Sequence, residues 1–177
     1  MIETERLILR AFRDEDREAF AAINGDPRVG DWLGGVIDRA ASDLMLDRIN
    51  THIDDKGWGL WAVERKSDQQ MIGFIGLSTV KAGALPVGPA IEIGWRLAHD
   101  AWGGGFATEG AQAALAWGFA HIDTAEIIAF TGAANLASQA VMRRIGMTAD
   151  PARDFDHPRL PEDSPLRRHV GFAAKRT

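Results

Sequence analysis

The sequence contains no cysteine, which excludes disulfide bonds, thiolate nucleophiles and cysteine-ligated zinc sites. Tyrosine is also absent, so any step that needs a phenolic proton donor must be performed by another group. The chain has no N-terminal signal pattern and no run of about 18 apolar residues. We therefore expect a cytoplasmic protein that does not interact with membranes.

The net charge and the length of the chain limit the classes of protein to which it can belong. The formal net charge of -5 argues against a broad nucleic-acid-binding surface, so we expect no nucleic-acid partner. The 177 residues suffice for a buried core, and no repeat or low-complexity linker divides them. We expect one domain over residues 1–177 without a metal site. The sequence does not fix the oligomeric state, and a homodimer is compatible with it.

The most informative stretch spans residues 91–110. Its first half alternates with the period of a strand, placing Ile91, Ile93, Trp95 and Leu97 on one face and Glu92, Gly94, Arg96 and Ala98 on the other. Three glycines at 103–105 follow, and small and apolar residues then recur at spacings of three and four up to Phe119. The stretch predicts a strand, a glycine turn and a helix.

The N-terminus of a helix that begins in this way can bind an anion. Its first backbone N–H groups have no intrahelical partners, and its dipole favours negative charge there. Glycine removes the Cβ atoms that would keep a phosphate away from those amides. The alternative is a plain strand-to-helix connection, in which glycine is also common, because short glycine motifs have low specificity.

The remaining pattern predicts an α+β fold, a mixed and mostly antiparallel sheet flanked by helices. In chain order we expect a strand at 5–12, a helix from about Asp14 to Asn24, and a second helix at about 41–52, whose apolar positions are Leu44, Leu46, Ile49 and Ile53. An antiparallel hairpin of strands 60–64 and 71–77 then precedes the central strand and the glycine helix. A strand at 125–131, a helix at 136–145 and a strand at 169–175 complete the chain. Asn135 is the expected N-cap of the last helix, and Gly146 its C-terminal glycine.

Residues 92–109 resemble motif A of the Gcn5-related N-acetyltransferases (GNAT), and the run 102–109 resembles the RimJ/RimL-like ribosomal-protein N-terminal acetyltransferase branch in particular. Asn135, Ser138, Gly146 and Met147 match the second motif of that branch. The segments 5–10, 58–63 and 72–77 are similar to it as well. The resemblance covers nearly the whole chain in the right order.

The resemblance implies an N-acetyltransferase that moves an acetyl group from acetyl-coenzyme A to a primary amine, either a protein N-terminus or a small molecule. The amine would attack the thioester directly in a ternary complex. The donor's pyrophosphate would lie on the turn, and its pantetheine arm would pair with the central strand, splayed from its neighbour by a bulge near Gly94. The implied donor-binding residues are Arg96, Leu97, Ala98, Trp102, Gly103, Gly104, Gly105, Phe106, Ala107, Thr108, Asn135, Ser138 and Arg143.

The catalytic candidates are Glu92 and Ser138. The central strand would hold Glu92 near the thioester as a general base, although Glu92 can equally be a structural carboxylate paired with Arg96. Many relatives place a tyrosine acid seven residues after the asparagine, where this chain has Met142. Ser138, on the same helix face, could instead donate a hydrogen bond to the departing sulfur, or be an ordinary first-turn serine.

Acceptor-binding candidates are Trp32, Glu92, His157 and Arg159. Trp32 belongs to a glycine-rich loop and is either a ligand contact or a core residue. His157 and Arg159 belong to a proline-stiffened loop that would border the acceptor; the alternative is a surface loop held by Asp–Arg pairs. Arg143 would reach the 3′-phosphate of coenzyme A; the alternative is that it only interacts favourably with the dipole at the C-terminal end of its helix.

Two other classes compete with the enzyme. One is a non-catalytic acyl-coenzyme A-binding module or sensor with the same fold. The other is a nucleotide-binding α/β domain, which is disfavoured because no Walker lysine and no dinucleotide fingerprint accompany the glycines. The resemblance does not identify the acceptor.

Overall fold

The structure of the chain, a computed structural model, describes residues 1–176. Its elements are, in chain order, β1 (Ile2–Glu3), β2 (Leu7–Arg10), α1 (Asp16–Gly25), α2 (Pro27–Gly30), α3 (Arg39–Lys56), β3 (Leu60–Arg65), β4 (Gln70–Val80), β5 (Ala90–Leu97), the 3-10 turn η1 (His99–Ala101), α4 (Phe106–His121), β6 (Glu126–Gly132), α5 (Leu136–Arg144), β7 (Thr148–Ala149), the 3-10 turn η2 (Pro151–Arg153), β8 (Phe155–Asp156) and β9 (Arg168–Lys175). Within these residues no helix has the length and apolar character needed to cross a membrane.

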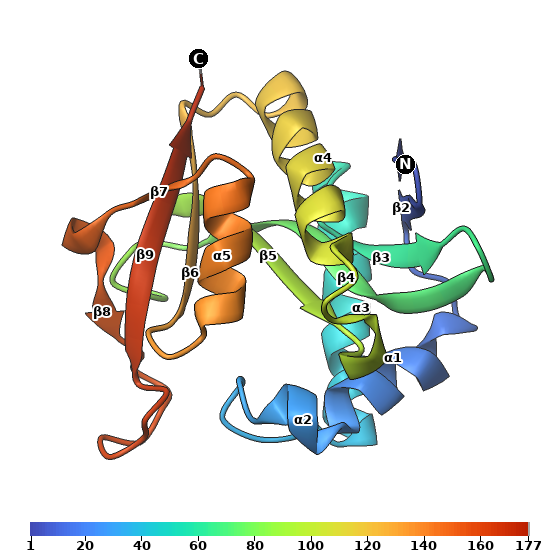
Figure 1. The fold of residues 1–177 in the computed structure, drawn as a ribbon, viewed down its shortest axis with the longest axis horizontal. Helices are drawn as coiled ribbons and strands as arrows, with labels where there is room; N and C mark the ends of the chain where they lie inside the picture. The colour runs from blue at the N-terminus through green and yellow to red at the C-terminus, as the bar shows by residue number, and fades with distance from the viewer. Residues whose placement is uncertain (177) are drawn as a thin grey trace.

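The strands of the described residues form one nine-stranded sheet in the order β1-β2-β3-β4-β5-β6-β9-β7, with β8 paired to β9. Neighbouring strands run antiparallel except β5 and β6, which are parallel. Helices α1 and α3 lie on one side of the sheet, and α4 and α5 on the other (Figure 1). This confirms the predicted α+β fold.

The smaller core lies between α1, α3 and the strands β3 and β4. Its buried members are Phe12, Phe20, Leu46, Ile49, Ala62 and Phe74. Helix α1 begins at Asp16 rather than near Asp14, and α3 extends beyond the predicted 41–52 at both ends. The prediction that Leu44 is a core position is wrong, because its exposed fraction is 57%. The buried stripe of α3 instead passes through Ser42, whose hydroxyl accepts a hydrogen bond of 2.9 Å from Asn24.

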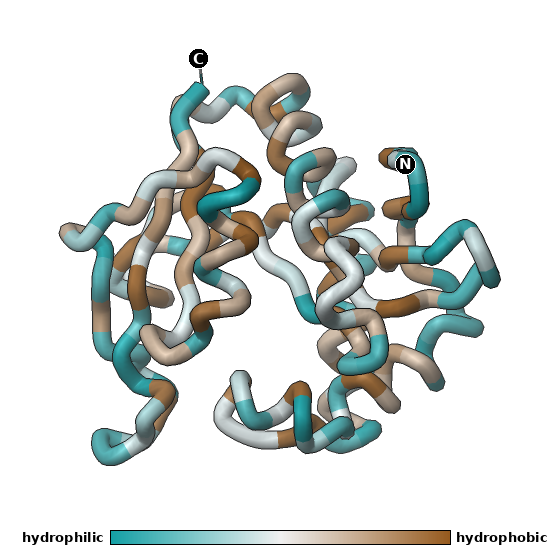
Figure 2. The backbone as a smooth tube through the Cα atoms, viewed as in Figure 1, coloured by the Kyte–Doolittle hydropathy of each residue, from teal (hydrophilic) through white to brown (hydrophobic). Residues whose placement is uncertain are grey.

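The larger core lies under α4 and α5, and Figure 2 shows hydrophobic residues along these helices and along the strands beside them. Small residues allow α4 to approach β4 closely. A Cβ atom at Gly110 would lie 2.5 Å from Ile75 Cδ1, and one at Gly118 would lie 2.8 Å from Leu77 Cδ1. This close packing fixes the position of the N-terminus of α4 relative to the sheet.

The predicted hairpin of β3 and β4 is confirmed, with β4 longer than expected. The bulge expected near Gly94 is not there, because the register between β4 and β5 is continuous through the pair Gly76↔Gly94. The irregularity lies instead between Val63 and Glu64, opposite the step from Gly73 to Met71. Gly73 has φ +141°, and a Cβ there would lie within 2.9 Å of Leu97, so glycine is needed at this position for the close approach of β5.

Candidate active site

Strand β5 loses its second neighbour partway along its length. It pairs with β4 from Ala90 to Leu97, but with β6 only at Glu92↔Ile128. The N–H of Ala98 donates to the carbonyl of Ile72 at 2.9 Å. Because antiparallel pairing alternates, Trp95 and Leu97 direct their N–H and C=O groups to the opposite edge, from which β6 has diverged. The result is a free strand edge beyond Glu92, on the side away from β4.

The start of α4 lies next to this edge and presents unpaired amides. Gly103 and Gly105 have φ of +74° and +80°, and Gly105 is the N-cap. The first bond of the helix runs from Glu109 N–H to the Gly105 carbonyl at 3.0 Å. Within residues 1–176, the N–H groups from 103 to 108 have no acceptor. This turn, residues 103–108, is therefore a suitable binding site for a phosphate group.

The turn is braced by the distant N-terminal segment. The Arg6 guanidinium donates to Glu109 at 2.6 Å and to the Gly104 carbonyl at 2.9 Å, and it lies 4.6 Å from the centre of the Phe106 ring. Thr4 Oγ1 also donates to Glu109 at 2.6 Å. Arg6 and Thr4 were not singled out from the sequence, because no local pattern indicates a contact across about 100 residues.

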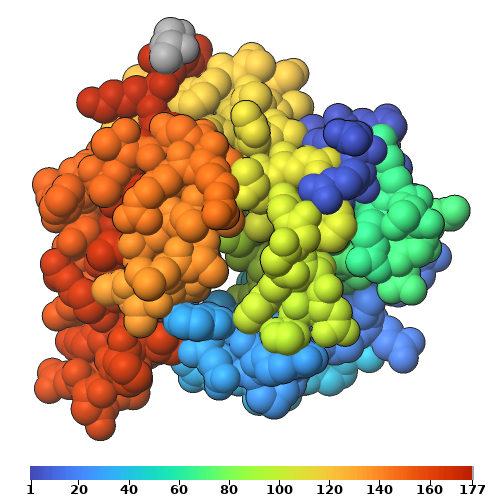
Figure 3. All heavy atoms as spheres, viewed as in Figure 1, coloured from blue at the N-terminus to red at the C-terminus, as the bar shows by residue number. Residues whose placement is uncertain are grey.

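Trp102 connects the turn to the strand edge. Its indole N–H donates to the Leu97 carbonyl at 2.9 Å, and its ring lies 4.8 Å from that of His99. The exposed fraction of Trp102 is 42%, so one face of the indole is available to a ligand. Figure 3 shows the surface hollowed between α5 and the segment that leads into α4.

Helix α5 borders the same hollow. The Asn135 side chain accepts a hydrogen bond of 3.1 Å from Ser138 N–H, which confirms the predicted N-cap. Ser138 is half-buried in the first turn, whereas Met142 is 2% exposed and belongs to the core. Arg143 lies 5.2 Å above the Phe172 ring, and its reach to a 3′-phosphate stays a prediction.

Glu92 lies where β5 and β6 meet, and it does not pair with Arg96. Burial raises the pKa of its carboxyl to about 7, and the hydrogen bond of 3.2 Å from Ser78 Oγ opposes this rise. Arg96 instead donates to Asn24 at 2.5 Å and lies 5.3 Å from the Phe74 ring. Burial lowers the pKa of Arg96 to about 10. The alternative of a structural Glu92–Arg96 pair is therefore wrong, because Arg96 turns away toward α1.

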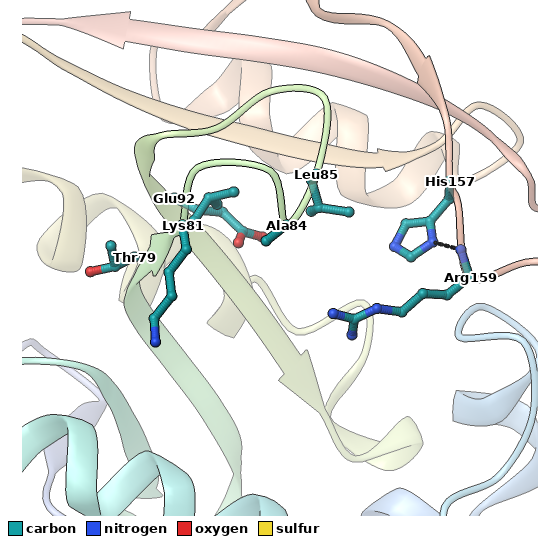
Figure 4. A pocket seen from close by; sticks show the side chains of 8 residues that line it. Thr79, Lys81, Ala84, Leu85, Glu92, His157 and Arg159 are labelled. Carbon is teal, nitrogen blue, oxygen red and sulfur yellow. Dashed lines mark hydrogen bonds between the residues drawn. The ribbon is translucent and has the colours of Figure 1, made fainter.

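A cavity of about 270 Å³ brings Glu92 together with His157 and Arg159, which come much later in the chain. Figure 4 shows Arg159 reaching from the segment after β8 toward the strand that carries Glu92. The lining residues are Thr79, Val80, Lys81, Ala84, Leu85, Glu92, His157 and Arg159. Lys81 and the segment after it were not predicted to line a site, because loop composition alone does not indicate which way a loop folds.

The His157 segment is held by aromatic packing and by Arg168. The His157 ring lies 4.9 Å from that of His169, and burial, together with His169 and Arg159, lowers the pKa of His157. Asp–Arg pairs do occur here, as Arg168 lies 3.4 Å from Asp154. Within residues 1–176, however, Arg159 forms no such pair.

Trp32 follows α2 in a loop that approaches the same region. Its exposed fraction is 41%, so the alternative of a core tryptophan is wrong. A Cβ atom at Gly34 would lie 2.7 Å from Leu160 Cδ2, so this loop packs against the segment that carries Arg159. A direct role for Trp32 in acceptor binding stays a prediction.

A mixed sheet that parts beside a glycine-initiated helix is the architecture of the GNAT acetyltransferases. Residues 6–148 match the family model described as acetyltransferase (GNAT) domain, and the chain belongs to this family. It is similar to the uncharacterized protein YkkB of Bacillus subtilis, at 30% identity over 147 residues that cover 81% of this chain and 83% of YkkB.

Two solved structures with bound ligands have the same fold. The spermidine N-acetyltransferase of Vibrio cholerae, in complex with CoA and spermine, has a TM-score of 0.75 at 16% identity, covering 97% of this chain and 96% of its own. Mycobacterium smegmatis RimJ, in complex with CoA-disulfide, has a TM-score of 0.74 at 21% identity, covering 96% and 81%. These similar values do not favour the RimJ/RimL branch over other GNAT members.

Proposed function

We propose that the protein is an acetyl-coenzyme A-dependent N-acetyltransferase that acts on a primary amine in a ternary complex. One observation carries the proposal: the unpaired amides of residues 103–108 lie beside a free strand edge that leads to Glu92. A pyrophosphate and a peptide-like arm are the two groups that such neighbouring sites accommodate. Coenzyme A contains both.

The donor's pyrophosphate accepts hydrogen bonds from the turn, where the helix dipole also favours negative charge. The pantetheine arm pairs with the free backbone groups of Trp95 and with the N–H of Leu97, within the segment where Arg96, Leu97 and Ala98 were expected to bind it. Trp102 covers this arm with its exposed indole face. The arm directs the thioester along β5 toward Glu92.

The chemical step is attack of the amine nitrogen on the thioester carbonyl carbon. The N–H of Trp95 points to the open side of β5 and stabilises the oxyanion that develops. Glu92, directly or through a water, accepts the proton that the nitrogen loses. A carboxyl with a pKa of about 7 suits this role, because a substantial fraction is ionised at neutral pH and that fraction is basic enough to take the proton.

The thiolate then departs, and the carbon–nitrogen bond remains. A thiol titrates near 8.5, so this departure needs little assistance at neutral pH. Ser138 is the available donor to the sulfur, since Met142 is buried and has no proton to give. This division of work is consistent with a chain that lacks tyrosine.

The attacking amine must be neutral. An α-amino group titrates near 8, so about a tenth or more is neutral at pH 7. A lysine side chain near 10.4 is roughly 2.4 units worse, equivalent to about 3 kcal/mol. Acceptors with a low amine pKa are therefore favoured. Trp32, His157 and Arg159 are the side chains proposed to contact the acceptor.

Calorimetry and pH-dependent kinetics test the proposal together. Coenzyme A should bind, whereas ATP and NAD should not. Thiol release with an amine panel should give a kcat/KM that rises with pH to a plateau above about 7, after correction for the neutral fraction of the amine. Glu92→Gln should reduce kcat/KM about 100-fold and remove this inflection. Binding of coenzyme A without turnover of any amine would favour the alternative, a non-catalytic acyl-coenzyme A sensor.

A further inference from the structure

Two cationic side chains of the cavity beside Glu92 have no carboxylate partner among the residues that the structure describes. Lys81 follows β4, and Arg159 follows β8; both line the cavity and both are exposed. Within residues 1–176 neither lies within 4.0 Å of a carboxylate oxygen, although Arg168 close by is paired with Asp154 and Asp156. Among the described residues that line the cavity, Glu92 alone is acidic.

These cations lie away from the turn that the donor phosphates would occupy. Along β5, Ile93 faces the core beneath α4, and Glu92 therefore points to the opposite face of the sheet. The cavity opens on that opposite face, whereas residues 103–108 lie at the start of α4. Lys81 and Arg159 are thus placed to meet the acceptor rather than the donor.

We infer that the acceptor is a primary amine that carries an anionic group, a carboxylate or a phosphate, a few bonds from its nitrogen. This inference rests on the proposed function and specifies its substrate class. The nitrogen lies near Glu92 while the anionic group lies between Lys81 and Arg159. A polyamine would instead bring a second ammonium group toward these two cations.

The direct test compares two acceptors of nearly equal shape, the dipeptide amides Asp-Gly-NH₂ and Asn-Gly-NH₂, with spermidine as a third, and each rate is corrected for the neutral fraction of its amine. Wild-type protein should acetylate the aspartyl compound with a kcat/KM about tenfold above that of the asparaginyl one, because a charge-assisted hydrogen bond is lost in the latter. Spermidine should be the poorest of the three. Amino phosphates and free amino acids then distinguish the sources of the anionic group.

Substitutions assign the preference to the cavity. Arg159→Gln should lower the aspartyl-to-asparaginyl ratio of kcat/KM about tenfold, mainly by raising the KM of the aspartyl acceptor. Lys81→Gln should act in the same direction. Arg48→Gln is the matched control, because Arg48 is exposed on α3, has no ion pair within residues 1–176 and lies outside the cavity lining. Coenzyme A affinity should be unchanged in all three variants.

Failure of this inference is distinguishable from failure of the proposed function. Equal rates with the two dipeptides, or preference for spermidine, would overturn the anionic acceptor while leaving the acetyltransferase intact. If no amine is turned over, calorimetry with the acetylated dipeptides in the presence of coenzyme A still tests whether the cavity prefers an anionic group. Tighter binding of acetyl-Asp-Gly-NH₂ that Arg159→Gln abolishes supports the inference, and equal binding of the two products rejects it.

Discussion

The Glu109 carboxylate, in the first turn of α4, accepts hydrogen bonds from both the backbone N–H and the side chain of Arg6, at 2.8 and 2.6 Å. Arg6 directly precedes β2, near the edge of the sheet that β1 forms, and it also reaches Gly104 inside the amide-rich turn. The conformation of that turn is therefore determined partly by a segment far from it in the chain.

Replacing Arg6 with Met should weaken coenzyme A binding several-fold without changing the acceptor KM. The carbonyl of Gly104 loses its donor and the carboxylate of Glu109 loses one of its three, so the turn must be ordered on binding. Stability should fall by no more than about 1 kcal/mol, because the pair is partly exposed. Arg65→Met is the control, since Arg65 also lies near Phe106 but pairs with Asp68. Equal donor affinities in both variants would contradict the bracing role.

Gly105→Ala should nearly abolish donor binding. Its φ of +80° costs an L-residue about 1–2 kcal/mol, and relief of that strain would rotate the amides away from their common direction. Gly57→Ala is the matched control, because Gly57 has φ +75° at the C-terminus of α3, and a Cβ atom added there would have no other atom within 4 Å. Both variants should lose similar stability by thermal unfolding, and calorimetry should show lost affinity for coenzyme A only at position 105.

Glu92→Gln should make the protein more stable at pH 8. Because burial raises the pKa of Glu92 in the folded state, its contribution to stability is fully present below about 4.5 and is lost as the pH rises through about 7. The free energy of unfolding of the variant should exceed that of wild type by up to about 3 kcal/mol above pH 7 and match it near pH 4. Urea unfolding across pH measures this. Glu5→Gln, which removes a carboxylate at an exposed position, is the control.

Asn135→Ala should destabilise the protein by about 1 kcal/mol, because Ser138 N–H loses its side-chain acceptor at the start of α5. Leu136→Ala, next in the chain and 70% exposed, should change stability by less than about 0.5 kcal/mol. Thermal unfolding compares the two. If Asn135 also contacts bound coenzyme A, Asn135→Ala should weaken coenzyme A binding, whereas Leu136→Ala should not.

The sequence was sufficient to predict the elements that carry a clear period or a capping residue. The alternation of residues 91–98, the glycines before α4 and the Asn135 cap each have a local cause, and each is found where expected. The two-residue strands β1, β7 and β8 were not predicted, because two residues cannot show a period. The prediction that Leu44 is buried was wrong for a related reason. Helical spacing is compatible with more than one buried face of α3, and the tertiary contact between Ser42 and Asn24 determines which face is buried.

The site was predictable to a similar extent. The amide-rich turn follows from local geometry, whereas its bracing by Arg6 depends on a pairing across the fold. The resemblance correctly indicated that β5 would part from a neighbour, but the expected bulge is absent and the strands simply diverge after one parallel pair. That Lys81 belongs to the cavity depends on the path of residues 81–89, which loop composition does not determine.

The single paired position between β5 and β6, Glu92↔Ile128, gives the sheet the geometry of an open angle with Glu92 at its vertex. The two sides are held at a fixed distance there, and their separation increases toward the C-terminal end of β5. Under the proposed function, a reacting carbon at the vertex would be confined between the two sides, whereas the bulky nucleotide end of the donor would lie where the sides are farthest apart. The proposed function thereby locates bond-making at the narrow end of the opening and entry of the donor at its wide end.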